Sequence, residues 1–324
     1  MKLATYYGGN IVQSAGVSAS GMHNPNGQLV GGHMDQRIIN LYDSFTHGHI
    51  NRRVFLDRLA ALTGSTAAAA AMLPLLKNDY AQAAIVADND SRLAMERISY
   101  DSPKSKISGY LVRPRSKGKR PVTIVIHENR GLNPHIEDVA RRLALEGFLA
   151  FAPDLLSVSG GTPPNEDQAR ELHTKTDQKD MTAAAAAAVP FMASYAESNG
   201  NVGMVGFCFG GGVVNRVAVE RPDLKAGVAY YGAQPAADQV PSIRAALLLH
   251  YAGLDERINA GIAGYEQALK ANGKRYTIYI YDGVNHAFNN DTGGARYNKE
   301  AADLAWGRTL AFFKEQLGTP ARAA

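Results

Sequence analysis

The sequence of 324 residues contains one cysteine, Cys208. An intrachain disulfide is therefore excluded, and a reactive thiol gains weight. We find no H-E-x-x-H motif or other metal-ligand set of recognisable spacing, so we expect no metal and no other cofactor. The net charge is only +4, and no array of basic and aromatic residues suggests nucleic acid as a partner. The composition is that of a soluble globular protein with one large domain or two ordinary ones.

The first part of the chain has little periodicity. Residues 1–33 are rich in Gly, Asn and Ser, so we expect an N-terminal extension, residues 1–34, that is disordered or an artefact of an early start codon. Met34 is a plausible alternative start. The apolar spacing from Asp35 to His47 predicts a short amphipathic helix.

Arg52 and Arg53 begin a segment with the three parts of a twin-arginine export signal. The arginine pair precedes an uncharged, Ala-rich stretch at residues 59–76 and then Ala81-Gln82-Ala83, a small-residue cleavage site. We therefore predict that residues 35–83 hold the short helix and this signal, and that the export machinery delivers the protein to the periplasm.

Two other interpretations of this segment stay open. The flanking residues Asn51 and Asp57 depart from the usual signal pattern, and the segment could instead be an Ala-rich helix packed on the domain of a cytoplasmic protein. A stable membrane anchor is not expected, because residues 59–76 include Pro74 and several polar residues and are at the short end for a span.

From residue 84 to residue 324 short apolar strands alternate with helical segments. Strands are predicted at 93–100, 107–112, 122–126, 148–152, 202–207, 226–231, 245–251 and 276–281, and helices at 136–146, 180–195, 259–271 and 297–317. The first two strands are expected to form a hairpin. Strands that alternate with helices predict an α/β fold with a mostly parallel central sheet and helices on both faces.

Cys208 lies at the centre of the pattern Gly206-Phe207-Cys208-Phe209-Gly210, between a predicted strand and a helical segment. This is the G-x-nucleophile-x-G pattern of an elbow that exposes a nucleophile on a strained turn. The two outer glycines are needed because a Cβ in so tight a turn would collide with the backbone. A lone cysteine between apolar residues is often a small buried hydrophobe. Its role as a nucleophile therefore depends on whether other loops supply catalytic partners.

Two loops after later strands carry suitable partners for the thiol. Asp255 follows the predicted strand at 245–251, and His286 follows the strand at 276–281. Nucleophile, acid and histidine in this order are typical of the triad of the α/β-hydrolase fold. His286 would take the proton of Cys208 or hold the thiolate as an ion pair, and Asp255 would orient the imidazole.

A third loop, His127-Glu128-Asn129-Arg130-Gly131, follows the strand at 122–126. The fold places an oxyanion donor there, so the amides of Asn129 and Phe209 would face the substrate carbonyl oxygen. Glu128 could pair with Arg130, or it could control the proton of the thiol.

Together these motifs resemble the dienelactone hydrolase family over about residues 92–317. The likeness rests on HENRGLNPHIEDVARRLALEGFLAFAPDL, VGMVGFCFGGG, AGLDERI and DGVNHAF, in the order that the family uses. The resemblance implies an α/β-hydrolase with Cys208 as nucleophile, Asp255 and His286 completing the triad, and Glu128 contacting the resting thiol. It also implies that the thiolate attacks an enol-lactone or ester and that water resolves the acyl-enzyme.

The chain departs from the family pattern where the substrate carboxylate is bound. The family has His-Ser-Phe-Ala-Arg, whereas this chain has residues 286–290 as His-Ala-Phe-Asn-Asn. Arg130, Arg170 and Arg296 are the candidate substitutes. We expect a lactone or carboxylic ester hydrolase with a small-molecule substrate. The alternatives are a thioester or short-acyl esterase, and a catalytically silent binding scaffold.

Overall fold

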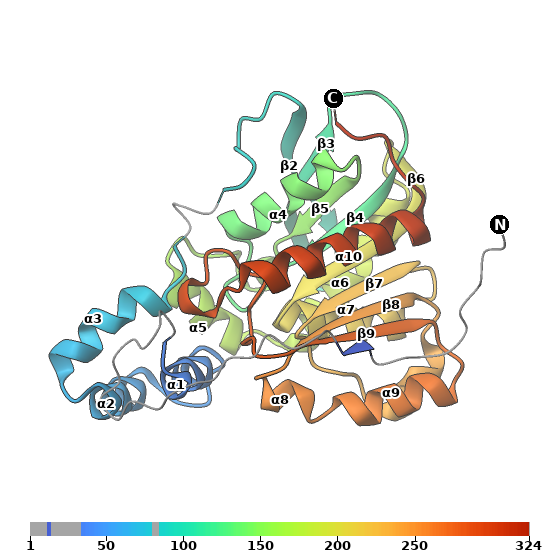
Figure 1. Cartoon of the computed structure of the whole chain (residues 1–324). Coiled ribbons are helices and arrows are strands. Elements are labelled where there is room, and N and C mark those ends of the chain that lie inside the picture. The colour runs from blue at the N-terminus through green and yellow to red at the C-terminus, as the bar shows by residue number, and fades with distance from the viewer. Residues whose placement is uncertain (1–11, 14–33, 80–83, 324) are drawn as a thin grey trace.

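The computed structural model describes residues 12–13, 34–79 and 84–323. Its centre is a nine-stranded sheet in the order β1-β9-β8-β7-β6-β4-β5-β3-β2 (Figure 1). The strands are β1 (Val12–Gln13), β2 (Leu93–Asp101), β3 (Lys106–Pro114), β4 (Arg120–Ile126), β5 (Leu149–Pro153), β6 (Ser198–Phe207), β7 (Ala226–Tyr230), β8 (Ala246–Ala252) and β9 (Tyr276–Tyr281). β3 pairs antiparallel with both β2 and β5, and the other pairs are parallel. The predicted opening hairpin and mostly parallel sheet are confirmed.

Helices cover both faces of this sheet. They are α4 (Pro134–Leu145), α5 (Glu166–Lys175), α6 (Gln178–Ala193), α7 (Phe209–Glu220), α8 (Glu256–Asn259), α9 (Ile262–Ala271) and α10 (Lys299–Leu317). Buried residues of α6, α7 and α9 form one apolar cluster with the sheet, and those of α4 and α10 form another. All residues of β4 and β8 are buried, as expected for strands covered on both faces.

The structure differs from the predicted elements in three places. The helix expected at 259–271 is divided into α8 and α9, and α5 was not predicted because only Ala169 of that helix is buried, which leaves a weak apolar period. β1 adds a two-residue parallel strand inside the segment expected to be disordered. The remainder of that segment, and the predicted cleavage site at 81–83, lie outside the described residues.

The N-terminal helices form a small unit beside the main domain (Figure 1). They are α1 (Gln36–Thr46), α2 (Arg52–Thr63) and α3 (Thr66–Leu76), and they share an apolar cluster of their own. Asp35, Asn51 and Ser65 each cap one of these helices by accepting a backbone N–H. In the described part of the chain no single helix is long and apolar enough to cross a membrane, and α2 and α3 reach that length only jointly, with a bend of 110° between them.

Candidate active site

Cys208 lies on a sharp turn between β6 and α7. Its backbone has φ 55° and ψ −116°, a region that residues with a Cβ rarely adopt. A Cβ on Gly206 would collide with the Gly210 carbonyl, and one on Gly210 would lie 2.5 Å from the Ile126 carbonyl oxygen. Both outer glycines are therefore required by sterics, as the elbow pattern predicted.

Backbone strain is concentrated around this turn. Besides Cys208, the non-glycine residues with positive φ in the described ranges are Tyr231, at 39°, and Ala287, at 66°. Tyr231 lines the cavity at the sulfur, and Ala287 directly follows His286. Strained residues persist only where the surrounding structure enforces them, and they cluster at functional sites.

The structure brings His286 and Asp255 together as predicted. Nδ1 of His286 lies 2.5 Å from Oδ2 of Asp255, and both side chains are buried. Nε2 of His286 is buried without a hydrogen-bond partner among the described residues. Burial opposes a charge on the ring, but the negative charges of the Cys208 thiolate and of Asp43 raise the pKa of His286 well above its ordinary value.

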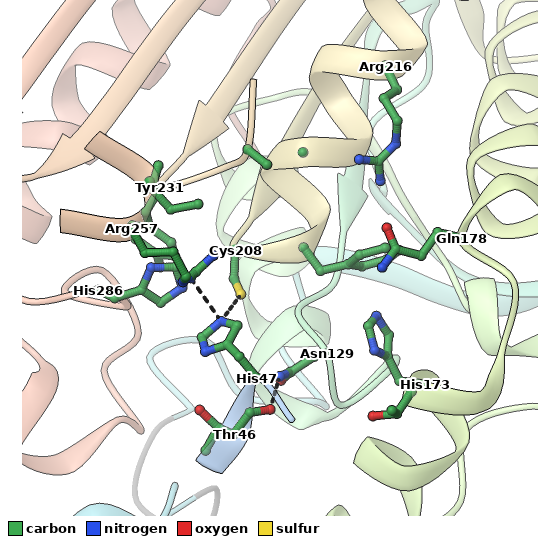
Figure 2. A pocket seen from close by; sticks show the side chains of 15 residues that line it. Thr46, His47, Asn129, His173, Gln178, Cys208, Arg216, Tyr231, Arg257 and His286 are labelled. Atoms are coloured by element: carbon green, nitrogen blue, oxygen red, sulfur yellow. Dashed lines mark hydrogen bonds between the residues drawn. The ribbon is translucent and has the colours of Figure 1, made fainter. Parts of the chain in front are cut away.

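The thiol also contacts a histidine that the sequence analysis missed. Nε2 of His47, at the end of α1, lies 3.3 Å from Sγ of Cys208 (Figure 2). Nδ1 of the same ring lies 2.8 Å from the main-chain oxygen of Asp43 and 3.2 Å from its carboxylate. The guanidinium of Arg257 lies 3.3 Å from Nε2. The two closely spaced histidines His47 and His49 were the available signal in the sequence. Nothing in their spacing indicates a contact with a residue 161 positions away.

Two imidazoles therefore flank the sulfur. Burial would raise the pKa of Cys208, but the positive charges of His286 and His47 lower it to about 6. Burial likewise opposes a charge on His47, whereas the Cys208 thiolate and Asp43 raise its pKa to about 9. The start of α7 adds a favourable dipole, because Cys208 caps its N-terminus. The site thus favours a thiolate beside an imidazolium at neutral pH.

Glu128 does not take the place that the resemblance implied. Its buried carboxylate accepts a hydrogen bond of 2.8 Å from Nδ2 of Asn290. The Cys208 thiol instead faces His47, at 3.3 Å, and His286. Asn290 occupies one of the positions at which the chain departs from the family pattern.

The two expected oxyanion donors border the cavity. Phe209 and Asn129 both line it beside Cys208. Phe209 is the first residue of α7, where amide groups lack an intrahelical acceptor. The side chain of Asn129 donates to the carbonyl oxygen of Thr46 at 2.8 Å, which holds its loop against α1.

The three arginines expected to bind the substrate are not brought to the sulfur. Arg130 contacts Tyr42 and forms an ion pair with Glu166, Arg170 lies over the Phe45 ring, and Arg296 contacts Asn78 and lies over the Tyr42 ring. None of the three lines the cavity at Cys208. Their guanidinium groups face the N-terminal helices instead.

The cavity at the sulfur has a volume of about 190 Å³. Its cationic side chains include Arg216 and Arg257 (Figure 2). His173 also faces it, and burial lowers the pKa of this ring to about 3, so it is neutral. The donor atoms of His47, Cys208 and His286 lie within 4.8 Å of one another, which would also leave space for a thiophilic cation. The expectation that no metal is needed stays a prediction.

Comparison with known proteins assigns the chain to a family. The model described as "Dienelactone hydrolase family" matches residues 107–317, and a second model, "YqhI-like", matches residues 32–64. "Putative carboxymethylenebutenolidase" of Escherichia coli O157:H7 is 34% identical over 251 residues, 72% of this chain and 92% of that protein. "Putative hydrolase fragment YghX" of E. coli (strain K12) is 50% identical over 112 residues, 34% of this chain and 96% of that protein.

Solved structures agree with these relatives. A structure described as "Putative Dienelactone Hydrolase" from Klebsiella pneumoniae has a TM-score of 0.62 at 30% identity and covers 69% of this chain and 99% of its own. A dienelactone hydrolase-like phosphotriesterase from metagenomic libraries has a TM-score of 0.63 at 22% identity, with 70% and 100% coverage, which shows the shared fold. The fold is that of the α/β-hydrolases, and the chain belongs to the dienelactone hydrolase family.

Proposed function

We propose that this protein hydrolyses a lactone or carboxylic ester through an acyl-enzyme on Cys208. The observation that carries the proposal is the arrangement at the elbow, where a strained cysteine with a lowered pKa lies beside a buried His286–Asp255 pair. A thiolate is a strong nucleophile, and an imidazolium held by a carboxylate can supply the leaving group with a proton. The relatives named as carboxymethylenebutenolidases support the lactone class.

The residues divide the reaction into two steps. The thiolate of Cys208 attacks the carbonyl carbon, and the amides of Phe209 and Asn129 stabilise the oxyanion. The intermediate collapses as His286 gives its proton to the leaving oxygen, which yields the acyl-enzyme. Neutral His286 then takes a proton from water, the hydroxide attacks the acyl carbon, and the thiolate leaves. Asp255 stabilises the charged imidazole throughout.

The cavity favours a small, negatively charged substrate. Nη2 of Arg216 is buried without a hydrogen-bond partner among the described residues, while its Nε donates to Thr182 at 3.0 Å. The guanidinium also lies over the Phe209 ring, beside the nucleophile. A substrate carboxylate would satisfy the free donor, since guanidinium and carboxylate groups form strong charge-assisted hydrogen bonds. Arg216 thus replaces the arginines proposed from the sequence.

The direct test is a burst assay with a chromogenic aryl ester and a small enol-lactone, with mass spectrometry of the protein during turnover. We expect an acyl adduct on Cys208 that forms and decays, and we expect Cys208→Ala to abolish turnover while the fold persists. Full activity of Cys208→Ala would show the mechanism to be wrong. No turnover of either substrate would favour the silent scaffold, and faster turnover of thioesters would favour the thioesterase.

The substrate charge is tested with Arg216→Gln. We expect KM for an anionic ester to rise about tenfold with little change in kcat, because the lost interaction is uniform binding. A neutral ester of equal size should be unaffected. Arg221→Gln is the matched control, because Arg221 pairs with Asp223 at the other end of α7. Equal losses for charged and neutral esters would contradict the assignment.

A further inference from the structure

We propose that residues 34–79 are a permanent part of the active site and that His47 is a catalytic residue, the resting partner of the Cys208 thiol. The proposal rests on Cys208 as the nucleophile. It adds to the triad a group from a segment outside the hydrolase domain. Three observations support it. Residues 34–79 are hydrogen-bonded to the loops of the active site, arginines of the domain contact this segment, and His47 and His286 are each held by an aspartate through Nδ1.

The segment is attached to the domain next to the nucleophile. The carbonyl of Thr46 accepts the side-chain amide of Asn129, a residue of the expected oxyanion loop, at 2.8 Å. At the start of α1 the side chain of Gln36 donates to Asn285, which directly precedes His286. Helix α1 is thus held at its start to the loop of His286 and at its end to the oxyanion loop. His47 extends from the turn after α1 to the sulfur.

The far end of the segment is attached as well. The backbone N–H of Asp79 donates to the carbonyl of Thr292 at 2.9 Å, and the side chain of Asn78 donates to Glu166 at 2.9 Å. Gly294 has φ 56° and lies against the Leu75 carbonyl, where a Cβ would collide. The domain backbone is therefore shaped to receive this end of the segment.

Two arginines of the domain contact aromatic rings of helix α1. The Arg170 guanidinium lies 4.4 Å from the centre of the Phe45 ring, and Arg296 lies 5.0 Å from that of Tyr42. At these distances each guanidinium is attracted to the face of the ring by a cation–π interaction. The N-terminal helices thus occupy the arginines that the sequence suggested for a substrate, and these cations stabilise the docked segment.

The chemistry at the sulfur is symmetrical. Nδ1 of His286 is held by the carboxylate of Asp255, and Nδ1 of His47 by the main-chain oxygen and the carboxylate of Asp43. Nε2 of His47 faces the sulfur and also the guanidinium of Arg257, each at 3.3 Å, so the negative charges of the thiolate and of Asp43 must outweigh the charge of Arg257. In the resting enzyme the S–H proton moves to Nε2 of His47 and forms a thiolate–imidazolium pair. His286 keeps its proton for the leaving oxygen and recovers one from water. His47 therefore does what the resemblance assigned to Glu128, whose carboxylate is bound to Asn290.

This assignment conflicts with removal of the N-terminal segment by an export peptidase. Cleavage after Ala83 would separate His47 from Cys208. The match to the "YqhI-like" model covers residues 32–64, so it includes His47 but ends before most of the Ala-rich stretch that a signal would need. An independent sequence family for this segment is consistent with a retained structural unit.

The test measures the thiolate without relying on turnover. The rate of Cys208 alkylation by iodoacetamide is followed by mass spectrometry from pH 4 to pH 10 in the full chain. We expect His47→Gln to move the midpoint upward by about one pH unit, which lowers the thiolate fraction near the old midpoint several-fold. The control is His49→Gln, because His49 is exposed on the same turn and should leave the profile unchanged. An unchanged midpoint in His47→Gln would overturn the proposal.

A second variant tests whether the effect of His47→Gln arises from the charge of the ring or from a packing defect. Asp43→Asn keeps the size of the side chain and does not touch the sulfur, but it weakens the charge on the His47 ring and, at longer range, on the His286 ring. We expect a smaller shift of the midpoint in the same direction, with circular dichroism unchanged. An Asp43→Asn profile equal to that of the wild type would contradict the role of His47. Because alkylation needs no substrate, the result stands apart from the acyl-enzyme assay.

The intact mass of protein from the producing cell tests retention. We expect the mature chain to contain residues 34–79. A mature N-terminus at Ala84 would overturn the proposal and support export with cleavage.

Discussion

The loops at the strand ends and the N-terminal helices contribute to the same sulfur in different ways. Cys208, Asp255 and His286 lie in the loops that follow β6, β8 and β9, so the parallel sheet brings them together. His47 comes from a helix that has its own apolar cluster and reaches the site by docking. The strand-end residues are positioned by the sheet from which their loops extend, whereas His47 is positioned by side-chain packing of the N-terminal helices on the domain. Variants can therefore separate the two contributions.

Asp255→Asn should have the largest effect. An amide can still occupy the site beside Nδ1 of His286, but it does not stabilise the imidazolium, so we expect kcat to fall about 10⁴-fold. Steady-state kinetics with an aryl ester measures this. The control is Glu256→Gln, because that neighbouring side chain is exposed. A loss of less than tenfold in Asp255→Asn would show that the strand-end histidine does not need its acid.

The pH dependence of activity should reflect both the strand-end residues and the N-terminal helices. The pKa of Cys208 is lowered to about 6, so the thiolate is lost as pH falls through that value, and activity should drop about tenfold for each further pH unit. The pKa of His47 is raised to about 9, so its positive charge is lost as pH rises through that value. The acid of the proposed mechanism is His286, whose pKa is raised well above its ordinary value, so kcat/KM should fall at high pH only where this ring loses its proton. We expect a bell-shaped profile of kcat/KM with a lower limit near 6. A lower limit near the ordinary pKa of a thiol would contradict this arrangement.

Phe55→Ala should affect the docked helices and spare the strand ends. Phe55 is fully buried and stacks on Phe45 with ring centres 4.7 Å apart. Loss of a buried phenylalanine typically costs about 3–5 kcal/mol, here from the packing of the N-terminal cluster. Hydrogen exchange should increase in α1 and α2 before it does in the sheet, and Cys208 alkylation should shift toward the His47→Gln profile. A wild-type profile would show that the cluster does not position His47.

Arg52→Gln should have the smallest effect on the folded enzyme. Arg52 is exposed and its ion pair with Asp167 spans 3.3 Å, so we expect a change below about 1 kcal/mol in unfolding free energy and no change in the alkylation profile. Urea unfolding measures the first quantity. If the arginine pair is an export signal, the same variant would instead abolish delivery to the periplasm in the producing cell.

Much of the domain could be predicted because its signals are local. Continuous apolar runs such as β4 and β8 indicate buried parallel strands, and the Gly206 to Gly210 pattern reports a steric requirement of one turn. The order of Cys208, Asp255 and His286 followed from strand ends, and the structure joins the last two at 2.5 Å. Helix α5 was missed because its apolar residues are Ala169 and Leu172 alone, too few to show a helical period.

The partners of the thiol and of the arginines could not be predicted in the same way. Arg130 and Arg170 follow or precede catalytic motifs in sequence, yet their side chains face α1. Glu128 lies in the expected oxyanion loop, next to Asn129, yet its partner is Asn290. A side chain can reach in several directions from one backbone position, and its partner depends on which distant segment packs there.

The sequence by itself determined the alternating strands and helices, the elbow and the order of the triad, because these are set by local sterics and by the period of apolar residues. Only the tertiary structure decided that α1 lies over the elbow and that His47 contacts Cys208. That contact joins positions 161 residues apart. It arises from the docking of one apolar cluster on the domain, and no local pattern around either residue specifies such docking.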